Sequence, residues 1–304
     1  MVFLAFCLSK KIRTKTNIFV VNLSVADFLT CTSIPVVSWS LLINDEEDVL
    51  LVDLPCRITI VLGQCFIGCS IITLAMIALN RWMLITKKRV LYHKFYRFKS
   101  IVVMLSFSWL LPLFVVVTPL LFDIGKVGYD EWSHNCALIE VHPHSYTFKI
   151  FLLLCLVPVP GSLIIYCYWS LFKYVKEHNS KISQGITEAF GLVTMNRHPF
   201  IFLPSSRSQS AGIDQRNCQY TKHQVDITKN LFYVVVTFVI CITPYMFAEL
   251  FKASAGIINH TKILVCLNSC LNPILYGVKH PHFRQVFKSI VRFRWSEIPQ
   301  PIYG

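Results

Sequence analysis

Residues 54–79, LPCRITIVLGQCFIGCSIITLAMIAL, are followed directly by Asn80, Arg81 and Trp82, and this stretch decides the fold class. Arg57 is its only charged residue. The stretch exceeds the roughly 20 apolar residues with which a helix crosses a hydrocarbon core of about 30 Å. Because a helix satisfies its own backbone hydrogen bonds in lipid, the stretch predicts a membrane-spanning α-helix.

Further apolar runs of similar length lie on both sides of this stretch. With 54–79 they predict six complete spans, the others being 18–43, 101–122, 146–172, 231–251 and 257–278. Residues 1–8 are also apolar, but at ~1.5 Å per residue they reach only about 12 Å. We interpret them as the basic-side end of a seventh helix whose beginning is missing, since they lack the basic region and cleavage site of a signal peptide. The predicted fold is an all-α membrane protein.

Composition and charge agree with this fold. Of the 304 residues 54% are hydrophobic and 15% are charged, which is more apolar than a soluble domain of this size can bury and excludes an ordinary cytosolic enzyme. Alternate loops hold 24 of the 29 Lys and Arg residues, and the positive-inside rule assigns these loops to the cytoplasm. This sorting explains the net charge of +13, so nucleic acid is not expected as a partner; the lipid bilayer is.

The connections divide the chain into a helix bundle over 1–279 and a cytoplasmic end over 280–304. The polar stretch of about 177–224 predicts one long flexible cytoplasmic loop. The sequence of 280–304 predicts an amphipathic surface helix followed by a short tail. The apolar face of this helix, with Phe283, Phe287 and Ile290, is expected to lie toward lipid. The sequon at Asn259 falls in a predicted outer loop, where glycosylation and a chance match are equally open.

Several polar residues lie inside the apolar runs. Asp27 requires an explanation because an ionisable group within a span is costly. The polar residues that converge with it in this prediction are Ser70, Asn268, Ser269 and Asn272. Such an oxygen-rich set suits a hard monovalent cation or a proton, but a hydrogen-bond network that holds three helices together explains it equally well. Pro273, in the same helix as Asn272, frees a backbone carbonyl and predicts a hinge.

Six features at consistent spacings resemble the rhodopsin-like, class A G-protein-coupled receptors. They are NLSVAD at 22–27, Cys56 placed 25 residues before Arg81, Arg81 itself, Trp109, CITP at 241–244 and NPILY at 272–276. The match covers nearly the whole chain in order. It implies a seven-helix receptor bundle, here with a largely truncated first helix. It also implies a multi-pass plasma-membrane protein with a cytoplasmic C-terminus, which transduces binding of an extracellular ligand to heterotrimeric G proteins and is not an enzyme.

The resemblance also implies roles for individual residues. Cys56 pairs with Cys136 in a disulfide, and no cofactor is expected apart from an allosteric sodium ion at Asp27, Ser70, Asn268, Ser269 and Asn272. Residues for G-protein coupling and activation are Asn80, Arg81, Trp82, Tyr168, Pro273 and Tyr276. Ile71, Pro160, Phe238 and Pro244 form the core relay. Arrestin is a second intracellular partner that the resemblance allows.

Some positions depart from the family pattern. Asn80 replaces the more usual aspartate beside the arginine, and Gln224 stands where many members have an acid. The resemblance therefore implies an inactive state held by fewer charge pairs. Ile242 occupies the place of the common tryptophan, so Phe238 or Tyr245 is expected to signal from the pocket floor.

The ligand is left open by the sequence. Gly63 stands where amine receptors have an aspartate, and Cys266 where opsins have the retinal lysine, which argues against both classes. The chain is most similar to melatonin receptors and to orphan receptors of the Moody and Trapped-in-endoderm type, although Ile242 and Pro273 depart from the melatonin receptors. Helical spacing predicts a pocket at Gly63, Gln64, Ile67, Tyr245, Glu249 and Lys262. An ion pair between Glu249 and Lys262 is the alternative to direct ligand contact by these two residues.

Other interpretations are a peptide or lipid receptor of the same class, a truncated receptor fragment that does not signal, and an ion-coupled membrane transporter. The transporter is disfavoured because the chain lacks the internal repeats common in such folds.

Overall fold

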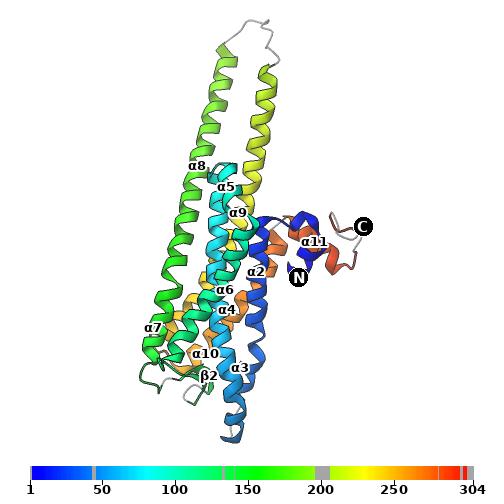
Figure 1. The fold of residues 1–304 in the computed structure, drawn as a ribbon. Helices are drawn as coiled ribbons and strands as arrows, with labels where there is room; N and C mark the ends of the chain where they lie inside the picture. The colour runs from blue at the N-terminus through cyan, green and yellow to red at the C-terminus, as the bar shows by residue number, and fades with distance from the viewer. Residues whose placement is uncertain are drawn as a thin grey trace.

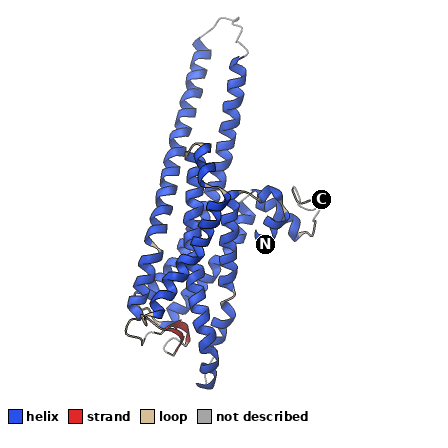
Figure 2. Ribbon diagram, viewed as in Figure 1, coloured by secondary structure: helices blue, strands red, loops and turns tan. Residues whose placement is uncertain are grey.

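The computed structural model covers all 304 residues. It describes residues 2–42, 46–131, 134–139, 141–195, 206–279, 281–294 and 297–299. Figure 2 shows that the described chain is helical apart from one two-stranded hairpin and short connections. The predicted all-α membrane fold is confirmed.

Helices α1 to α6 make up the first part of the bundle (Figure 1). Their bounds are α1 Val2–Leu8, α2 Lys15–Cys31, α3 Ile34–Ser40, α4 Glu46–Thr86, α5 Arg89–Phe95 and α6 Phe98–Leu121, with a short 3₁₀ turn η1 at Lys10–Ile12. The antiparallel strands β1 (Val127–Asp130) and β2 (Asn135–Leu138) follow, paired with Tyr129 opposite Cys136. The remaining helices are α7 Ser145–Leu156, α8 Pro158–Met195, α9 Ser206–Leu250, α10 Ala255–Lys279 and α11 Pro281–Val291.

Six helical segments of the described chain are long and apolar enough to cross a membrane, which confirms the six predicted spans. They are Lys15–Ser40, Val49–Thr86, Phe98–Leu121, Ser145–Glu177, Thr228–Leu250 and Gly256–Val278. Two of these spans are each interrupted between consecutive helices. One break is at Thr32–Ser33, with Pro35 in the first turn of the helix that follows, and the other is at Val157, directly before Pro158. Proline has no N–H to donate, so it is tolerated in a first helical turn.

Helix α4 lies at the centre of the bundle and contacts α2, α6, α8, α9 and the hairpin. Apolar side chains also cover the outside of the bundle. Phe114 on α6 is 67% exposed and Ile165 on α8 is 71% exposed. Large apolar side chains at this density on an outer surface mark contact with lipid rather than water.

The prediction of a long loop over 177–224 is wrong for most of these residues. Helix α8 continues to Met195 and α9 begins at Ser206, and Figure 1 shows both extending beyond the other helices. No proline occurs between Pro160 and Pro199, so nothing in this polar stretch stops the helix. Residues 196–205 lie outside the described chain. We call the end of the bundle to which α8 and α9 extend the basic end, and the opposite end the hairpin end.

The helix predicted after residue 280 is α11, but its apolar face does not point outward. Phe283, Phe287 and Ile290 are buried in the main core. The Phe283 ring lies 5.9 Å from that of Tyr276, between ring centroids. A side chain on Gly277 would place its Cβ 2.9 Å from the Phe287 ring, so glycine permits this close packing of α11 on α10. Helix α11 also contacts α1, whose Val2 and Ala5 are buried in the same core.

Candidate functional site

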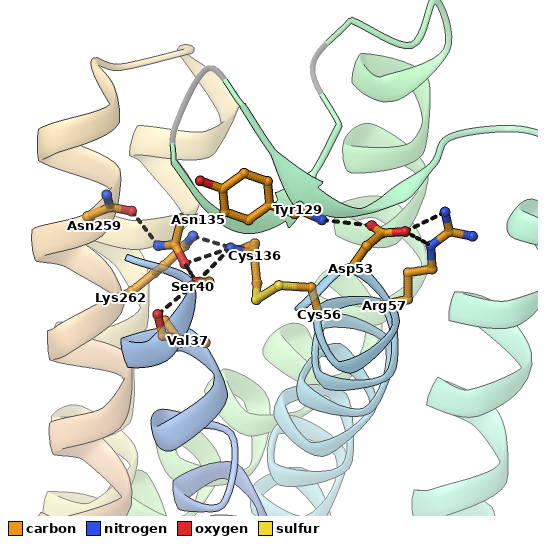
Figure 3. Close-up of a disulfide and its surroundings, with 10 residues drawn as sticks. All are labelled: Val37, Ser40, Asp53, Cys56, Arg57, Tyr129, Asn135, Cys136, Asn259 and Lys262. Atoms are coloured by element: carbon orange, nitrogen blue, oxygen red, sulfur yellow. Dashed lines mark hydrogen bonds and ion pairs between the residues drawn. A yellow bond between two sulfur atoms is a disulfide. The ribbon is translucent and has the colours of Figure 1, made fainter. Parts of the chain in front are cut away.

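A disulfide attaches the β1–β2 hairpin to α4 at the hairpin end of the bundle (Figure 3). Cys56 on α4 is bonded to Cys136 on β2 with their Cα atoms 5.0 Å apart, which confirms the predicted pair. The other cysteines whose side chains the structure describes are free. Beside the disulfide, Asp53 accepts a hydrogen bond from the Tyr129 backbone N–H at 3.1 Å and pairs with Arg57 at 2.7 Å. Helix α4 therefore holds both strands.

Asn135 links the hairpin to two further helices. Its Oδ1 accepts a hydrogen bond from the Ser40 hydroxyl of α3 at 2.9 Å, and its Nδ2 donates to Asn259 Oδ1 of α10 at 2.8 Å. The sequon at Asn259 thus lies in a helix and not in an outer loop. Sequence reasoning missed the Asn135–Asn259 contact, because the two residues are 124 positions apart.

Two adjoining cavities lie beneath the hairpin. One of about 460 Å³ lies between α2, α3, α4 and α10, and one of about 120 Å³ lies between α4, α7 and α9. The residues that line both are Ile60, Gln64, Ile67, Cys136, Tyr245 and Lys262. Gly63 lines only the larger cavity and Glu249 only the smaller one. The structure therefore brings the six predicted pocket residues together, while their contact with a ligand stays a prediction.

The charged groups of the pocket pair differently from the prediction. Glu249 forms an ion pair with Lys149 of α7 at 2.8 Å, and Lys262 donates to the backbone carbonyl of Cys136 at 3.1 Å. The expected pair between Glu249 and Lys262 is wrong. Sequence reasoning missed Lys149; its signal was a single cation inside the apolar run 146–172.

The predicted ion site lies between α2 and α10. Asn272 Nδ2 donates a hydrogen bond to Asp27 Oδ2 at 2.7 Å, and Ser269 interacts with the same carboxyl group. Asn268 Oδ1 and Asn272 Oδ1 are buried without a hydrogen-bond partner in the described chain. Ser70 is buried on α4. Buried acceptors without donors are rare in proteins, so this oxygen-rich set fits a hard cation such as sodium.

Arg81 is buried at the basic end with two tyrosines from other helices. It lies close enough to Tyr168 of α8 to interact electrostatically with the hydroxyl, and Tyr168 interacts with Tyr276 of α10 in the same way. Both tyrosine hydroxyls are buried and have no hydrogen-bond partner within the described residues. Polar groups from α4, α8 and α10 thus converge at the basic end of the bundle.

The neighbours of Arg81 connect it to the surrounding helices. Asn80 Oδ1 accepts a hydrogen bond from the Thr16 hydroxyl of α2 at 2.5 Å, and Asn80 Nδ2 donates to the Tyr92 hydroxyl of α5 at 3.3 Å. Trp82 donates to the Ser170 hydroxyl of α8 at 3.0 Å. Asn80 therefore links α4 to α2 and α5 at the basic end.

The predicted relay residues occupy the middle of the bundle. Ile71 and Phe238 are buried in the main core, and Pro160 and Pro244 are half-buried on α8 and α9. Pro273 falls within α10, and its side chain is outside the described part of the chain. A second polar link crosses the bundle nearby, where Trp109 Nε1 donates to Asn22 Oδ1 at 2.9 Å and Asn22 Nδ2 donates to Thr73 at 2.8 Å.

The sequence and the structure were compared with known proteins. Residues 1–276 match the family described as "7 transmembrane receptor (rhodopsin family)". The G-protein coupled receptor moody of Drosophila melanogaster is 23% identical over 92% of this chain and 47% of that receptor. Melatonin receptor type 1A of Mus musculus is 26% identical over 96% of this chain and 75% of that receptor. The chain spans about half the length of the moody receptors that it matches.

The fold was compared with solved structures as well. The crystal structure of squid rhodopsin superposes with a TM-score of 0.70, at 18% identity and over 96% of this chain and 79% of that one. The likeness shows that both chains share one helix arrangement.

Proposed function

This chain belongs to the rhodopsin family of seven-transmembrane receptors, and from this premise we propose that it transduces binding of an extracellular ligand to heterotrimeric G proteins. Members of this family are receptors and not enzymes, and coupling to G proteins is typical of them. The chain is a multi-pass membrane protein. We place it in the plasma membrane, with the basic end and the C-terminus in the cytoplasm.

The observation that carries this proposal is the convergence of Arg81, Tyr168 and Tyr276 at the basic end. The two tyrosine hydroxyls are buried without hydrogen bonds in the described chain, and leaving such groups unsatisfied costs about 1–3 kcal/mol each. A movement that separates the ends of α8, α9 and α10 would expose these groups to water and to a partner. G protein is the partner proposed for that opened surface, and arrestin is a second one.

The experiment measures nucleotide exchange on purified heterotrimeric G protein by the full chain in lipid nanodiscs, with a panel of indoleamines, lipids and short peptides. Arg81→Ala is expected to lower exchange at least tenfold, because it removes the group that meets the G protein. Arg57→Ala is the matched control, since Arg57 lies at the hairpin end and pairs only with Asp53 among the described residues. Equal exchange by wild type and Arg81→Ala, or ion flux through the protein, would contradict the proposal.

An allosteric sodium ion at Asp27 is the second part of the proposal. Its support is the pair of buried amide oxygens of Asn268 and Asn272 next to the Asp27 carboxylate. The chain's own residues would hold the ion between α2 and α10. The ion would supply the positive charge that these oxygens lack.

The relatives do not decide the ligand. Melatonin is the ligand in the names of several relatives, but identities of 25–26% are too low to transfer it to this chain. Ile242, which lines the smaller cavity, also stands where the family commonly has tryptophan. The ligand is therefore argued from the pocket itself.

A further inference from the structure

Lys262 lines the pocket and has no acidic partner among the described residues. It lines both cavities and donates one hydrogen bond, to the Cys136 carbonyl at 3.1 Å. Figure 3 shows its side chain extending from α10 toward the hairpin beside Cys136. Among the described residues no carboxylate lies within 4.0 Å of its ammonium group. An ammonium has three N–H donors, so two remain available to a ligand.

The acidic side chain that lines the smaller cavity, Glu249, is already neutralised. Glu249 is paired with Lys149 at 2.8 Å, and both side chains are mostly buried. Glu249 and Asp130 influence Lys262 electrostatically but do not contact it. A cationic ligand would have to break the Lys149–Glu249 pair, whereas an anionic ligand would complete the interactions of a buried cation.

Most of the remaining wall area is apolar. The larger cavity of about 460 Å³ is lined by aliphatic side chains that include Val37, Leu41, Ile60, Ile67 and Ile263, and its polar lining comes from hydroxyl and amide side chains and His260. An inorganic anion would satisfy Lys262 but would leave this apolar surface in contact with water. A ligand with an apolar body buries it, and burial of apolar area is the main driving force for binding.

Resting on the proposed receptor function, we propose that the pocket binds a lipophilic carboxylate, a single acid group on an apolar body. The carboxylate accepts a charge-assisted hydrogen bond from Lys262. Gln64 and Tyr245 also line both cavities, but Gln64 hydrogen-bonds with Tyr245 and Tyr245 with Glu249, so Lys262 is the group that recognises the carboxylate. The apolar body lies along the aliphatic wall of the larger cavity.

The test is a direct binding titration of the full chain in phosphatidylcholine nanodiscs, with decanoate as the probe and saturation-transfer NMR as the readout. Lys262→Met is expected to weaken decanoate binding at least tenfold, and Lys262→Arg to retain most of it. Lys252→Met is the matched control, because Lys252 lies over the Tyr146 ring and outside both cavities. Methyl decanoate, which has no charge, is expected to bind more weakly and without dependence on Lys262.

Equal binding of decanoate by wild type and Lys262→Met, or equal binding of decanoate and its methyl ester, would overturn the inference. Thermal unfolding of each variant shows whether it is folded, and Lys262→Arg tests the charge if Lys262→Met is not. The binding measured by NMR does not depend on coupling to a G protein. Binding through Lys262 without nucleotide exchange would leave this inference standing and contradict the receptor proposal, whereas exchange driven by another ligand without decanoate binding would do the reverse.

Discussion

At the scale of single residues, the buried polar groups depend on partners from distant parts of the chain. Asp27 is bonded to Asn272 across 245 positions, and the pocket acid Glu249 is bonded to Lys149. Next to the disulfide, a side chain on Gly128 would overlap Asp53, so the absence of a Cβ lets Asp53 reach the Tyr129 backbone. Each contact satisfies a group that is costly to bury alone.

Replacing potassium by sodium in the buffer is expected to stabilise the wild-type chain, because the ion binds only the folded site. At a sodium concentration ten times the dissociation constant the gain is about 1.4 kcal/mol. Asp27→Asn is expected to abolish this gain, since it removes the negative charge that holds the ion. Thermal unfolding in the two salts measures the effect.

Asp123→Asn is the control for this experiment, because the Asp123 side chain is 92% exposed and distant from the ion site in sequence and fold. A sodium response that persists in Asp27→Asn would argue against an ion at this carboxylate.

At the scale of elements, prolines and glycines decide where helices break and how closely they pack. Pro158 begins α8, and Pro35 lies in the first turn of α3, in each case just after a break within a span. Gly277 allows α11 to lie against α10 with the Phe287 ring in the space that a side chain would fill. The basic end is therefore built by close contacts between α1, α10 and α11 rather than by loops alone.

Gly277→Ala is expected to destabilise the protein by about 1–3 kcal/mol, because the new Cβ overlaps the buried Phe287 ring. The same substitution in a Phe287→Ala background is expected to cost close to nothing, since the ring is gone. A double-mutant cycle by thermal unfolding isolates this coupling. If Gly277→Ala costs the same in both backgrounds, the contact between α10 and α11 is not the reason for the glycine.

At the scale of the whole molecule, charge and burial divide the surface into zones. Most Lys and Arg residues lie in the loops and helix ends of the basic end, whereas the outer faces of the spans carry exposed apolar side chains. The disulfide-bonded hairpin closes the opposite end over the pocket. This arrangement fits a protein that receives a ligand at one end and a partner at the other.

An epitope attached after residue 304 is expected to be detected by antibody only after cells are permeabilised, because the positive-inside rule places the basic end in the cytoplasm. A fluorescent plasma-membrane marker in the same cells checks the location. Detection in intact cells would reverse the assigned orientation, and with it the proposal that Arg81 meets a G protein.

The sequence by itself determined the spans and the cysteine pair implied by family resemblance, and its charge sorting predicts their orientation. These depend on local hydrophobicity and on motifs at fixed spacings, which single helices preserve. It also predicted the six residues that line the cavities, because helical spacing places Gly63, Gln64 and Ile67 on one face. The prediction of a long loop over 177–224 was wrong, because a polar composition is typical of a solvent-exposed helix as well as of a loop.

Only the tertiary structure decided which polar groups meet. Sequence reasoning paired Glu249 with Lys262, but the packing of α7 against α9 brings Lys149 to Glu249 and leaves Lys262 on the hairpin carbonyl. The tertiary structure also buries the apolar face of α11 against α10 and α1. The rotation and depth of each helix are set by side-chain packing between distant segments, and a pattern read along one segment does not contain that information.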